Sequence, residues 1–434
     1  MIEGLQPYAE YKESGLPWAG LIPSRWNVKR GKSLFAESQL PVRDGDEIVT
    51  CFRDGQVTLR RNRRTSGFML ALYEAGYQGV RRGQLVIHAM DAFAGAIGVS
   101  DSNGKCTPEY IVTNPRSSMA SASYFALLLR YVAHQGFILV SCPAVRERAP
   151  RFRYPDFGDL QMPLPSPGEQ AAMVRFLDHA NRKIDGFIRA KKRELSLITE
   201  TLMTVTEESL VKPCATVMRL STAAALVHRP IDRRAGDYYT RIGLFNRGRG
   251  IFHKPPVSGT DLGDSEFFSI EKGDLVISGQ FAWEGAVALA RDKDKGCIAS
   301  HRYPILRGRE KIISSAGLLA ILRTKLGGML MDHHSRGAAG RNRPLNINTL
   351  LKEKIPIPSP VAQVQITNLL EQEYSVAQAV ARSIRLVDEY RSRLTGDVVT
   401  GKLDVRPAAA RLPDLAAAAE SLEELETEQE EMDQ

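Results

Sequence analysis

Arginine and asparagine side chains gather in parts of this sequence at spacings suited to binding nucleic acid. The first group occupies the stretch RDGQVTLRRNRR and the RR pair after it, and its members are Arg53, Arg60, Arg61, Asn62, Arg63, Arg64, Arg81 and Arg82. Arg forms bidentate hydrogen bonds with guanine, Asn does so with adenine, and any Arg can bind a phosphate. We predict DNA contact within this group, the alternative being a solvated basic loop. Because side chains alternate along a strand, only some members would face the duplex.

The second half of the chain contains two competing groups of the same kind. Arg247 and Arg249 lie in RIGLFNRGRGIFHK, and the other group, in HHSRGAAGRNRPLN, has the members Arg336, Arg341, Asn342 and Arg343. Glycines in both stretches allow the backbone to approach a phosphate closely. We favour the second group slightly, because it comes just before the expected end of its domain. No carboxylate or Cys stands at ligand spacing from its His pair, so we predict no metal site.

The net positive charge of the chain favours binding to a polyanion. It has 434 residues, with 58 Lys and Arg against 50 Asp and Glu, a net charge of +8. Nine of the acidic residues follow Arg411, where there is no Lys or Arg, so the rest of the chain carries 58 basic against 41 acidic residues, or +17. Such a basic body is typical of proteins that bind DNA. The acidic tail, residues 407–434, is predicted to be disordered or loosely helical.

Other features indicate the compartment. No apolar run approaches the roughly 20 residues that span a bilayer, and no signal-peptide pattern opens the sequence. The five cysteines are odd in number, widely spaced and never in a C-x-x-C pair, which disfavours disulfides and zinc sites. We therefore expect a cytoplasmic, nucleoid-associated protein without membrane contact.

The chain is a tandem repeat. MPLPSPGEQ, residues 162–170, returns as IPIPSPVAQ, residues 355–363, 193 positions later. VRRGQLVIHAMDAFAGAIGVS, residues 80–100, returns as IEKGDLVISGQFAWEGAVALA, residues 270–290. The second pair predicts short strands joined by Gly-containing turns. We expect two mixed domains of α/β (α+β) class, related by a pseudo-repeat.

A long helix follows each Pro-rich hinge. Apolar residues fill eight of ten successive a/d positions after the first hinge and seven of nine after the second. Such a seam needs a partner helix, and the other copy is the simplest one, which predicts an antiparallel coiled coil. Gln170 and Gln363 close the two hinge motifs. They either cap the helices or dock a partner subunit, and the sequence leaves both roles open.

These patterns divide the chain into five parts. They are an N-terminal segment with the first domain, residues 1–161; a hinge and helix, 162–212; the second domain, 213–354; a second hinge and helix, 355–406; and the tail, 407–434.

In this order the parts resemble the DNA specificity subunit of type I restriction-modification systems. YKESGLPWAGLIPSRWNVKR, residues 11–30, looks like the family's N-terminal segment, and GQLVIHAMDAFAGAIGVS looks like a strand motif of its target recognition domains. PLPSPGEQ with its helix looks like the central conserved region, and EYRSRLTGDVVTGKLDVR, residues 389–406, looks like the C-terminal one. The acidic tail is not part of this pattern.

The resemblance implies two target recognition domains, each reading half of a bipartite, asymmetric site in the major groove of double-stranded DNA. It implies that the helices set the gap between half-sites and dock two methyltransferase subunits, which carry S-adenosylmethionine and methylate adenine. Two motor-nuclease subunits would be further partners. It also places the N-terminal segment beside the C-terminal conserved region. Since the recognition domains vary widely in the family, no base preference is implied.

We predict no catalysis and no cofactor in this chain. It lacks the Asn/Asp-Pro-Pro-aromatic motif of adenine methyltransferases and the phosphate-binding loop of motor ATPases. A nuclease site of scattered carboxylates and lysines leaves little local signature, so the sequence does not test that possibility. Two alternatives stay open: a similar two-domain DNA reader in a different defence assembly, and a scaffold that binds DNA without sequence selectivity.

Overall fold

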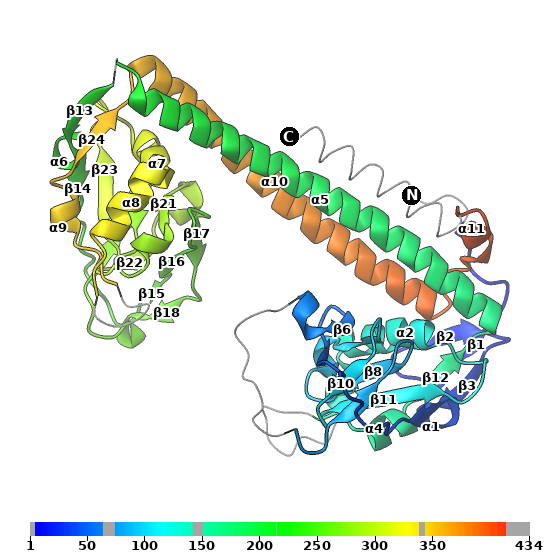
Figure 1. The fold of residues 1–434 in the computed structure, drawn as a ribbon. Helices are drawn as coiled ribbons and strands as arrows, with labels where there is room; N and C mark the ends of the chain where they lie inside the picture. Colours follow the sequence, from blue (N-terminus) through cyan, green and yellow to red (C-terminus); the bar gives the residue numbers. More distant parts are fainter. Residues whose placement is uncertain (1–4, 64–73, 142–150, 214, 338–342, 414–434) are drawn as a thin grey trace. The chain divides into compact units, whose positions relative to one another are not determined.

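The structure is a computed structural model that describes residues 5–63, 74–141, 151–213, 215–337 and 343–413 (Figure 1). It has two compact units, one of residues 1–188 with 384–434 and one of residues 189–383. Each unit therefore contains one globular domain and part of both long helices. Within the described residues, no helix is both long enough and apolar enough to span a membrane.

The domain of the first unit is built on a four-stranded antiparallel sheet of order β4-β11-β8-β9. Its strands are β1 Tyr11–Glu13, β2 Leu21–Pro23, β3 Asn27–Arg30, β4 Phe35–Glu37, β5 Val49–Cys51, β6 Val57–Leu59, β7 Gln78–Val80, β8 Leu85–His88, β9 Ile97–Val99, β10 Gly104–Cys106, β11 Tyr110–Pro115 and β12 Gln161–Leu164. Its helices are α1 Gly31–Leu34, α2 Ala122–His134, α3 Phe137–Ser141 and α4 Tyr154–Asp159, with the 3₁₀ turns η1 Arg60–Asn62 and η2 Ala92–Ala94.

The domain of the second unit repeats this sheet as β14-β23-β20-β21, again antiparallel. Its strands are β13 Thr216–Arg219, β14 Ala224–Leu226, β15 Tyr238–Tyr239, β16 Ile242–Leu244, β17 Ile251–His253, β18 Val257–Ser258, β19 Phe267–Ser269, β20 Leu275–Ile277, β21 Val287–Leu289, β22 Ile298–Ser300, β23 Ile305–Gly308 and β24 Lys354–Ile357. Its helices are α6 Leu220–Ala223, α7 Ser315–Arg323, α8 Lys325–His333 and α9 Ile347–Leu350, with the 3₁₀ turns η3 Gly259–Asp261, η4 Ala282–Glu284 and η5 Asp292–Asp294. The predicted α+β class and tandem repeat are confirmed.

Each sheet packs against a helix that starts in the same way. Ser121 accepts a hydrogen bond from the amide of Tyr124 and begins α2, while Ser314 does the same with the amide of Gly317 and begins α7. A Ser at this position satisfies an amide that the helix leaves free. The apolar faces of α2 and α7 then pack on β8 and β20, whose residues Leu85 and Leu275 are fully buried. These contacts form the core of each domain.

The two long helices are α5, Pro167–Val211, and α10, Pro360–Val399. In the second unit Leu202 of α5 clusters with Ile366 and Leu370 of α10. Seven residues earlier on α5, Leu195 lies across a cavity from Ala377. The two helices therefore run in opposite directions, and the predicted antiparallel coiled coil is confirmed.

The first residues of the chain pack on the end of α10, as the resemblance implied. The backbone amide of Asp404 donates to the carbonyl of Gln6 at 2.7 Å, and the Tyr11 hydroxyl donates to the carbonyl of Lys402 at 3.1 Å. Gly401 has a φ of 77°, and a Cβ there would collide with the Trp26 ring. This contact joins both ends of the sequence in one core. The helix α11, Arg406–Ala410, continues it, so the tail predicted from residue 407 begins with ordered residues. Residues 414–434 of that tail lie outside the described part.

Trp26 also reaches the first turn of α5. Its indole Nε1 donates to Oε1 of Glu169 at 3.0 Å, and Nη2 of Arg25 lies 2.9 Å from the same oxygen. The amide and hydroxyl of Ser166 donate to the other carboxylate oxygen at 3.1 and 2.6 Å. Burial raises the pKa of Glu169, but the hydrogen bonds from Ser166 and Trp26 and the charge of Arg25 outweigh it, so the pKa is lower than usual.

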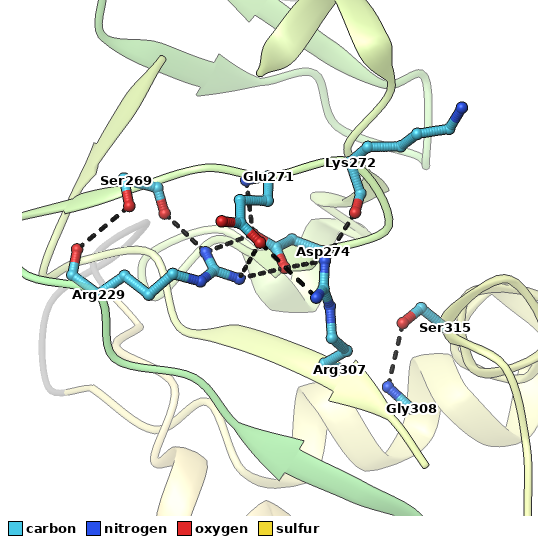
Figure 2. Close-up of polar contacts among 8 residues, drawn as sticks. All are labelled: Arg229, Ser269, Glu271, Lys272, Asp274, Arg307, Gly308 and Ser315. Atoms are coloured by element: carbon cyan, nitrogen blue, oxygen red, sulfur yellow. Dashed lines mark hydrogen bonds and ion pairs between the residues drawn. The ribbon is translucent and has the colours of Figure 1, made fainter. Parts of the chain in front are cut away.

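A buried ion cluster braces the sheet of the second domain (Figure 2). Asp274 is fully buried and accepts hydrogen bonds from both terminal nitrogens of Arg229, at 2.8 and 2.7 Å. Arg307 lies 3.3 Å from the same carboxylate, and the backbone amide of Glu271 donates to it at 2.9 Å. The guanidinium groups of Arg229, in the loop after β14, and of Arg307, in β23, are thereby held to the turn before β20.

In the first domain neutral groups occupy the equivalent place. Gln84 stands at the position of Asp274, and its amide nitrogen donates to Ser38 at 3.0 Å and to Asn114 at 3.1 Å. Its carbonyl oxygen accepts from the backbone amide of Arg81 at 2.7 Å, just as Asp274 accepts from Glu271. Both copies thus keep the hydrogen bond from the turn's backbone amide, while the side chain that accepts it is neutral in the first domain and charged in the second.

Replacing Glu169 with Gln should make the first unit less sensitive to acid. Because the folded pKa is depressed, this carboxylate stabilises the fold above its unfolded pKa of about 4.3, and that stability is lost as the pH falls through the folded value. At pH 7 the variant should lose about 1–3 kcal/mol of unfolding free energy. Urea unfolding followed by Trp fluorescence in a Trp283→Phe background reports on the first unit alone. Identical pH profiles for both proteins would contradict this role.

Replacing Asp274 with Asn should lower the unfolding free energy of the second unit by about 2–3 kcal/mol, because the buried side chain loses its charged hydrogen bonds to Arg229 and Arg307, which are 22% and 42% exposed. Asp292→Asn is the matched control. Its ion pair with Lys272 is 64% and 78% exposed, and such pairs contribute about 1 kcal/mol or less. Hydrogen exchange of the β20 and β23 amides measures both. Equal losses in the two variants would show that the cluster is not a brace.

Candidate nucleic-acid interface

The first predicted group is organised by ion pairs around η1. Nη1 of Arg61 lies 2.7 Å from Glu47, and Nη1 of Arg63 lies 2.6 Å from Asp54. Arg63 also stacks on the ring of Phe52, with its guanidinium carbon 4.3 Å from the ring centroid. The Arg61 side chain is nevertheless 65% exposed. The pairs hold these guanidinium groups in place at the surface without covering them.

The other members of this turn have partners within it. Asn62 donates to the hydroxyl of Thr58 at 2.8 Å, and Nε of the half-buried Arg60 donates to Thr50 at 3.4 Å. Arg53, 67% exposed, pairs with Asp91 at 2.8 Å. Asp91 immediately precedes η2, so this contact joins the Arg53 loop to η2. Arg64 lies outside the described residues.

Arg81 and Arg82 are adjacent in sequence but differ in their surroundings. The Arg81 side chain is only 15% exposed, and its Nη1 donates to Asp46 at 3.0 Å and to the carbonyls of Val80 and Gly104. These bonds hold the guanidinium of Arg81 against the domain, and its contact with DNA stays a prediction. Arg82 is exposed, and we predict that it still contacts DNA.

In the second domain the Arg247–Gly250 loop lies against η4. The backbone amide of Arg247 donates to the carbonyl of Glu284 at 2.9 Å, and that of Gly248 donates to Gly285 at 2.8 Å. Arg247 has a φ of 59°, the only positive φ of a residue other than Gly in the described chain. The backbone bonds to η4 stabilise this uncommon conformation. Arg249 is exposed and stacks on Phe245 at 5.3 Å.

The competing group contacts the same turn through a different residue. Arg343 stacks on the ring of Trp283 at 5.0 Å and pairs with Asp332 at 2.8 Å. Arg336 is exposed, and its Nε donates to the carbonyl of His333 at 3.2 Å. Arg341 and Asn342 lie outside the described residues. The sequence analysis treated the two groups as alternatives. In the structure both contact η4, one through Glu284 and the other through Trp283.

The same arrangement occurs in the first domain. The Gly95 that ends η2 corresponds to Gly285 of η4, and a Cβ at Gly95 would come within 3.0 Å of the carbonyl of Arg53. A Cβ at Gly285 would similarly lie 3.4 Å from Cα of Arg247. Each domain therefore carries an arginine loop over the glycine of its 3₁₀ turn. The sequence comparison missed this equivalence, because the spacing between the arginine loop and the 3₁₀ turn differs between the two copies.

A cavity of about 450 Å³ in the second unit adds cations that the sequence analysis missed. It brings Arg247 and Arg249 together with Lys293, Arg291 and Arg323. Arg291 pairs with Glu371 at 2.5 Å and stacks on Tyr374, and Arg323 forms a bidentate pair with Glu373 at 2.6 and 2.7 Å. These residues are scattered in the sequence and carry no local signal. Only the fold gathers them.

The two hinge glutamines face inward. Gln170 is fully buried, and its side chain hydrogen-bonds Pro165, Met119 and Ser121. Gln363 is half-buried and donates to Pro358 and Ile312. Of the two roles left open, partner docking does not fit Gln170, because its amide has no exposed surface. Gln363 makes equivalent bonds, although its partial exposure leaves its docking role a prediction.

The described residues give little support for a metal site or a reactive cysteine. They include no group of three or more His, Cys, Asp or Glu side chains able to hold a metal ion. His334, one of the His pair, is bonded to Thr349 at 2.8 Å and to Glu353 at 3.0 Å. Burial raises the pKa of the Cys51 and Cys106 thiols to about 12, so both are protonated at neutral pH.

No family model matches this chain, and no curated protein sequence matches it. By structure it is similar to a chain from a type I R-M system, solved for the complex assembly and conformational transition of that system. The TM-score is 0.56 at 14% identity, over 87% of this chain and 98% of that one. The HsdS subunit from Thermoanaerobacter tengcongensis gives 0.44 at 13% identity, over 88% and 98% of the two chains. The type I restriction-modification S subunit from M. genitalium gives 0.46 at 11%, over 89% and 99%. The first match confirms the predicted resemblance at the level of the fold.

The contrast between Arg81 and Arg82 leads to a paired test. Arg81→Ala should cost about 2–3 kcal/mol of unfolding free energy, because the carboxylate of Asp46 loses its counter-charge and keeps only the hydrogen bond from the Arg43 amide. Arg82→Ala should change it by less than about 0.5 kcal/mol, as surface substitutions usually do. Hydrogen exchange of the β7 and β10 amides measures both. An Arg81→Ala variant as stable as Arg82→Ala would contradict this structural role.

Proposed function

We propose that this chain is the DNA specificity subunit of a type I restriction-modification complex and reads a bipartite, asymmetric site in double-stranded DNA. The observation that carries the proposal is the duplicated recognition unit. Each copy has the same sheet order and an exposed arginine loop over the glycine of an equivalent 3₁₀ turn. Two such units in one chain suit two half-sites. Because the loops differ in sequence, the half-sites would differ too.

The arginine loops suit base and phosphate contact. Arg53, Arg61 and Arg247 have exposed side chains on backbone that is fixed by neighbouring bonds. Side chains held in place lose less conformational freedom on binding, which favours specific contact. The acidic partners of Arg53 and Arg61 would be exchanged for guanine edges or phosphates, which accept bidentate hydrogen bonds from Arg.

The chain would be a non-catalytic subunit. Two methyltransferase subunits would dock on the long helices, bind S-adenosylmethionine and methylate adenine, and two motor-nuclease subunits would complete a restriction complex. The protein would act in the cytoplasm at the nucleoid. The support is the fold shared with a component of a type I R-M system, the basic charge and the paired helices.

The methylation pattern of a host genome tests this proposal. The chain would be expressed with its neighbouring methyltransferase gene in a methylation-free host, and modified adenines would be located by sequencing. We expect one split motif with a fixed gap, absent when the methyltransferase is expressed alone. A stable complex without a split motif would favour a reader for another defence assembly. Binding that weakens steeply with salt and never prefers one sequence would favour a non-selective scaffold.

A further inference from the structure

Gln170 joins three parts of the first unit through one side chain. Its Nε2 donates to the carbonyl of Pro165 in the hinge and to that of Met119 before α2, both at 2.8 Å. Its Oε1 accepts from the backbone amide of Ser121, the residue that caps α2, also at 2.8 Å. Its own backbone amide belongs to the first turn of α5, bonded to Ser166 at 3.0 Å. The side chain thus ties helix, hinge and recognition domain together.

Gln363 repeats this geometry in the second unit. Its Nε2 donates at 2.9 Å to the carbonyl of Pro358 in the hinge and to that of Ile312 before α7. The sequence separations are the same in both copies, five residues to the hinge proline and 51 to the second carbonyl. Bonds repeated at the same separations, in copies whose other polar contacts have changed, indicate a function that both domains share.

The chemistry of the junction requires an amide side chain. The two acceptors are backbone carbonyls, so the side chain must donate twice from one nitrogen, which a neutral amide does. Gln170 is fully buried, so its loss would leave these carbonyls without a donor and without water. A Glu of the same size would keep the bond from Ser121 but would place a carboxylate against two carbonyl oxygens.

We propose that Gln170 and Gln363 are positioning residues that fix the angle between each recognition domain and its long helix, and thereby set the number of base pairs between the two half-sites. The inference rests on the proposed function. Successive base pairs are about 3.4 Å apart and are rotated by roughly 35° about the DNA axis. A domain that can tilt by a few ångströms would therefore accept a neighbouring spacing.

The two junctions differ in their additional support. At the first hinge Glu169 adds the buried bond to Trp26, whereas the equivalent residue at the second hinge is Ala362. The second domain has other ties to α10, because Arg291 and Arg323 pair with Glu371 and Glu373. Each hinge glutamine therefore acts together with further contacts between its domain and a long helix.

The experiment uses the full chain, expressed with its methyltransferase in a methylation-free host. Gln170→Ala and Gln363→Ala should methylate the same two half-sites, with sites one base pair shorter or longer gaining at least tenfold in occupancy. Gln170→Glu should behave like Gln170→Ala, because the carboxylate cannot donate to the two carbonyls. The matched control is Gln84→Ala, which removes a buried glutamine that is bonded only inside its domain. It should lower total methylation at most and leave the single spacing unchanged.

Three outcomes would overturn the inference. They are a single unchanged spacing in both hinge variants, an equal relaxation in Gln84→Ala, and altered half-site bases in place of an altered gap. If a hinge variant does not accumulate, the more conservative Gln170→Asn and Gln363→Asn keep the donor on a shorter side chain and answer the same question. A split motif in the unmodified protein upholds the proposed function whatever these variants do, so the two failures are distinguishable.

Discussion

The attachment of each long helix to its globular domain is the constraint on which this structure depends. Each Pro-rich hinge begins as a paired strand, β12 with β3 and β24 with β13, but its prolines have no amide to donate. It needs bonds from outside, which Gln170 and Gln363 supply from the first turns of α5 and α10. The hinges are thereby fixed junctions between a globular core and a helix. Each compact unit contains its domain and the adjoining helix ends for this reason.

The arginine side chains of the first domain are held in place by ion pairs and yet stay exposed to solvent. Arg53, Arg61 and Arg63 each have an acidic partner, although all three remain at least one-third exposed. Exposed pairs contribute little stability, so their main effect is to restrict the side chains. Arg81 differs from these three, because its guanidinium is mostly buried and forms several hydrogen bonds inside the domain. Neighbouring arginines of one sequence motif can therefore have different roles.

The two copies have kept their geometry while changing their chemistry. Gln84 and Asp274 hold the same turn, one through neutral partners and the other through two guanidinium groups. The second brace depends on a negative charge, and the first does not. Glu169 adds a tie to one hinge only, where the N-terminal segment supplies Trp26. Duplication thus preserved backbone contacts more strictly than the side chains that satisfy them.

The sequence by itself determined the repeat, the α+β class and the antiparallel helices, because apolar periodicity and proline act locally and leave a pattern in both copies. It also located the arginine-rich stretches around Arg61 and Arg247. Tertiary structure alone decided that Arg81 is buried and that Arg247 and Arg343 share η4. It also brought Arg291 and Lys293 beside Arg247. Exposure and proximity depend on which strands meet, and residues far apart in the chain carry no signal of that before it folds.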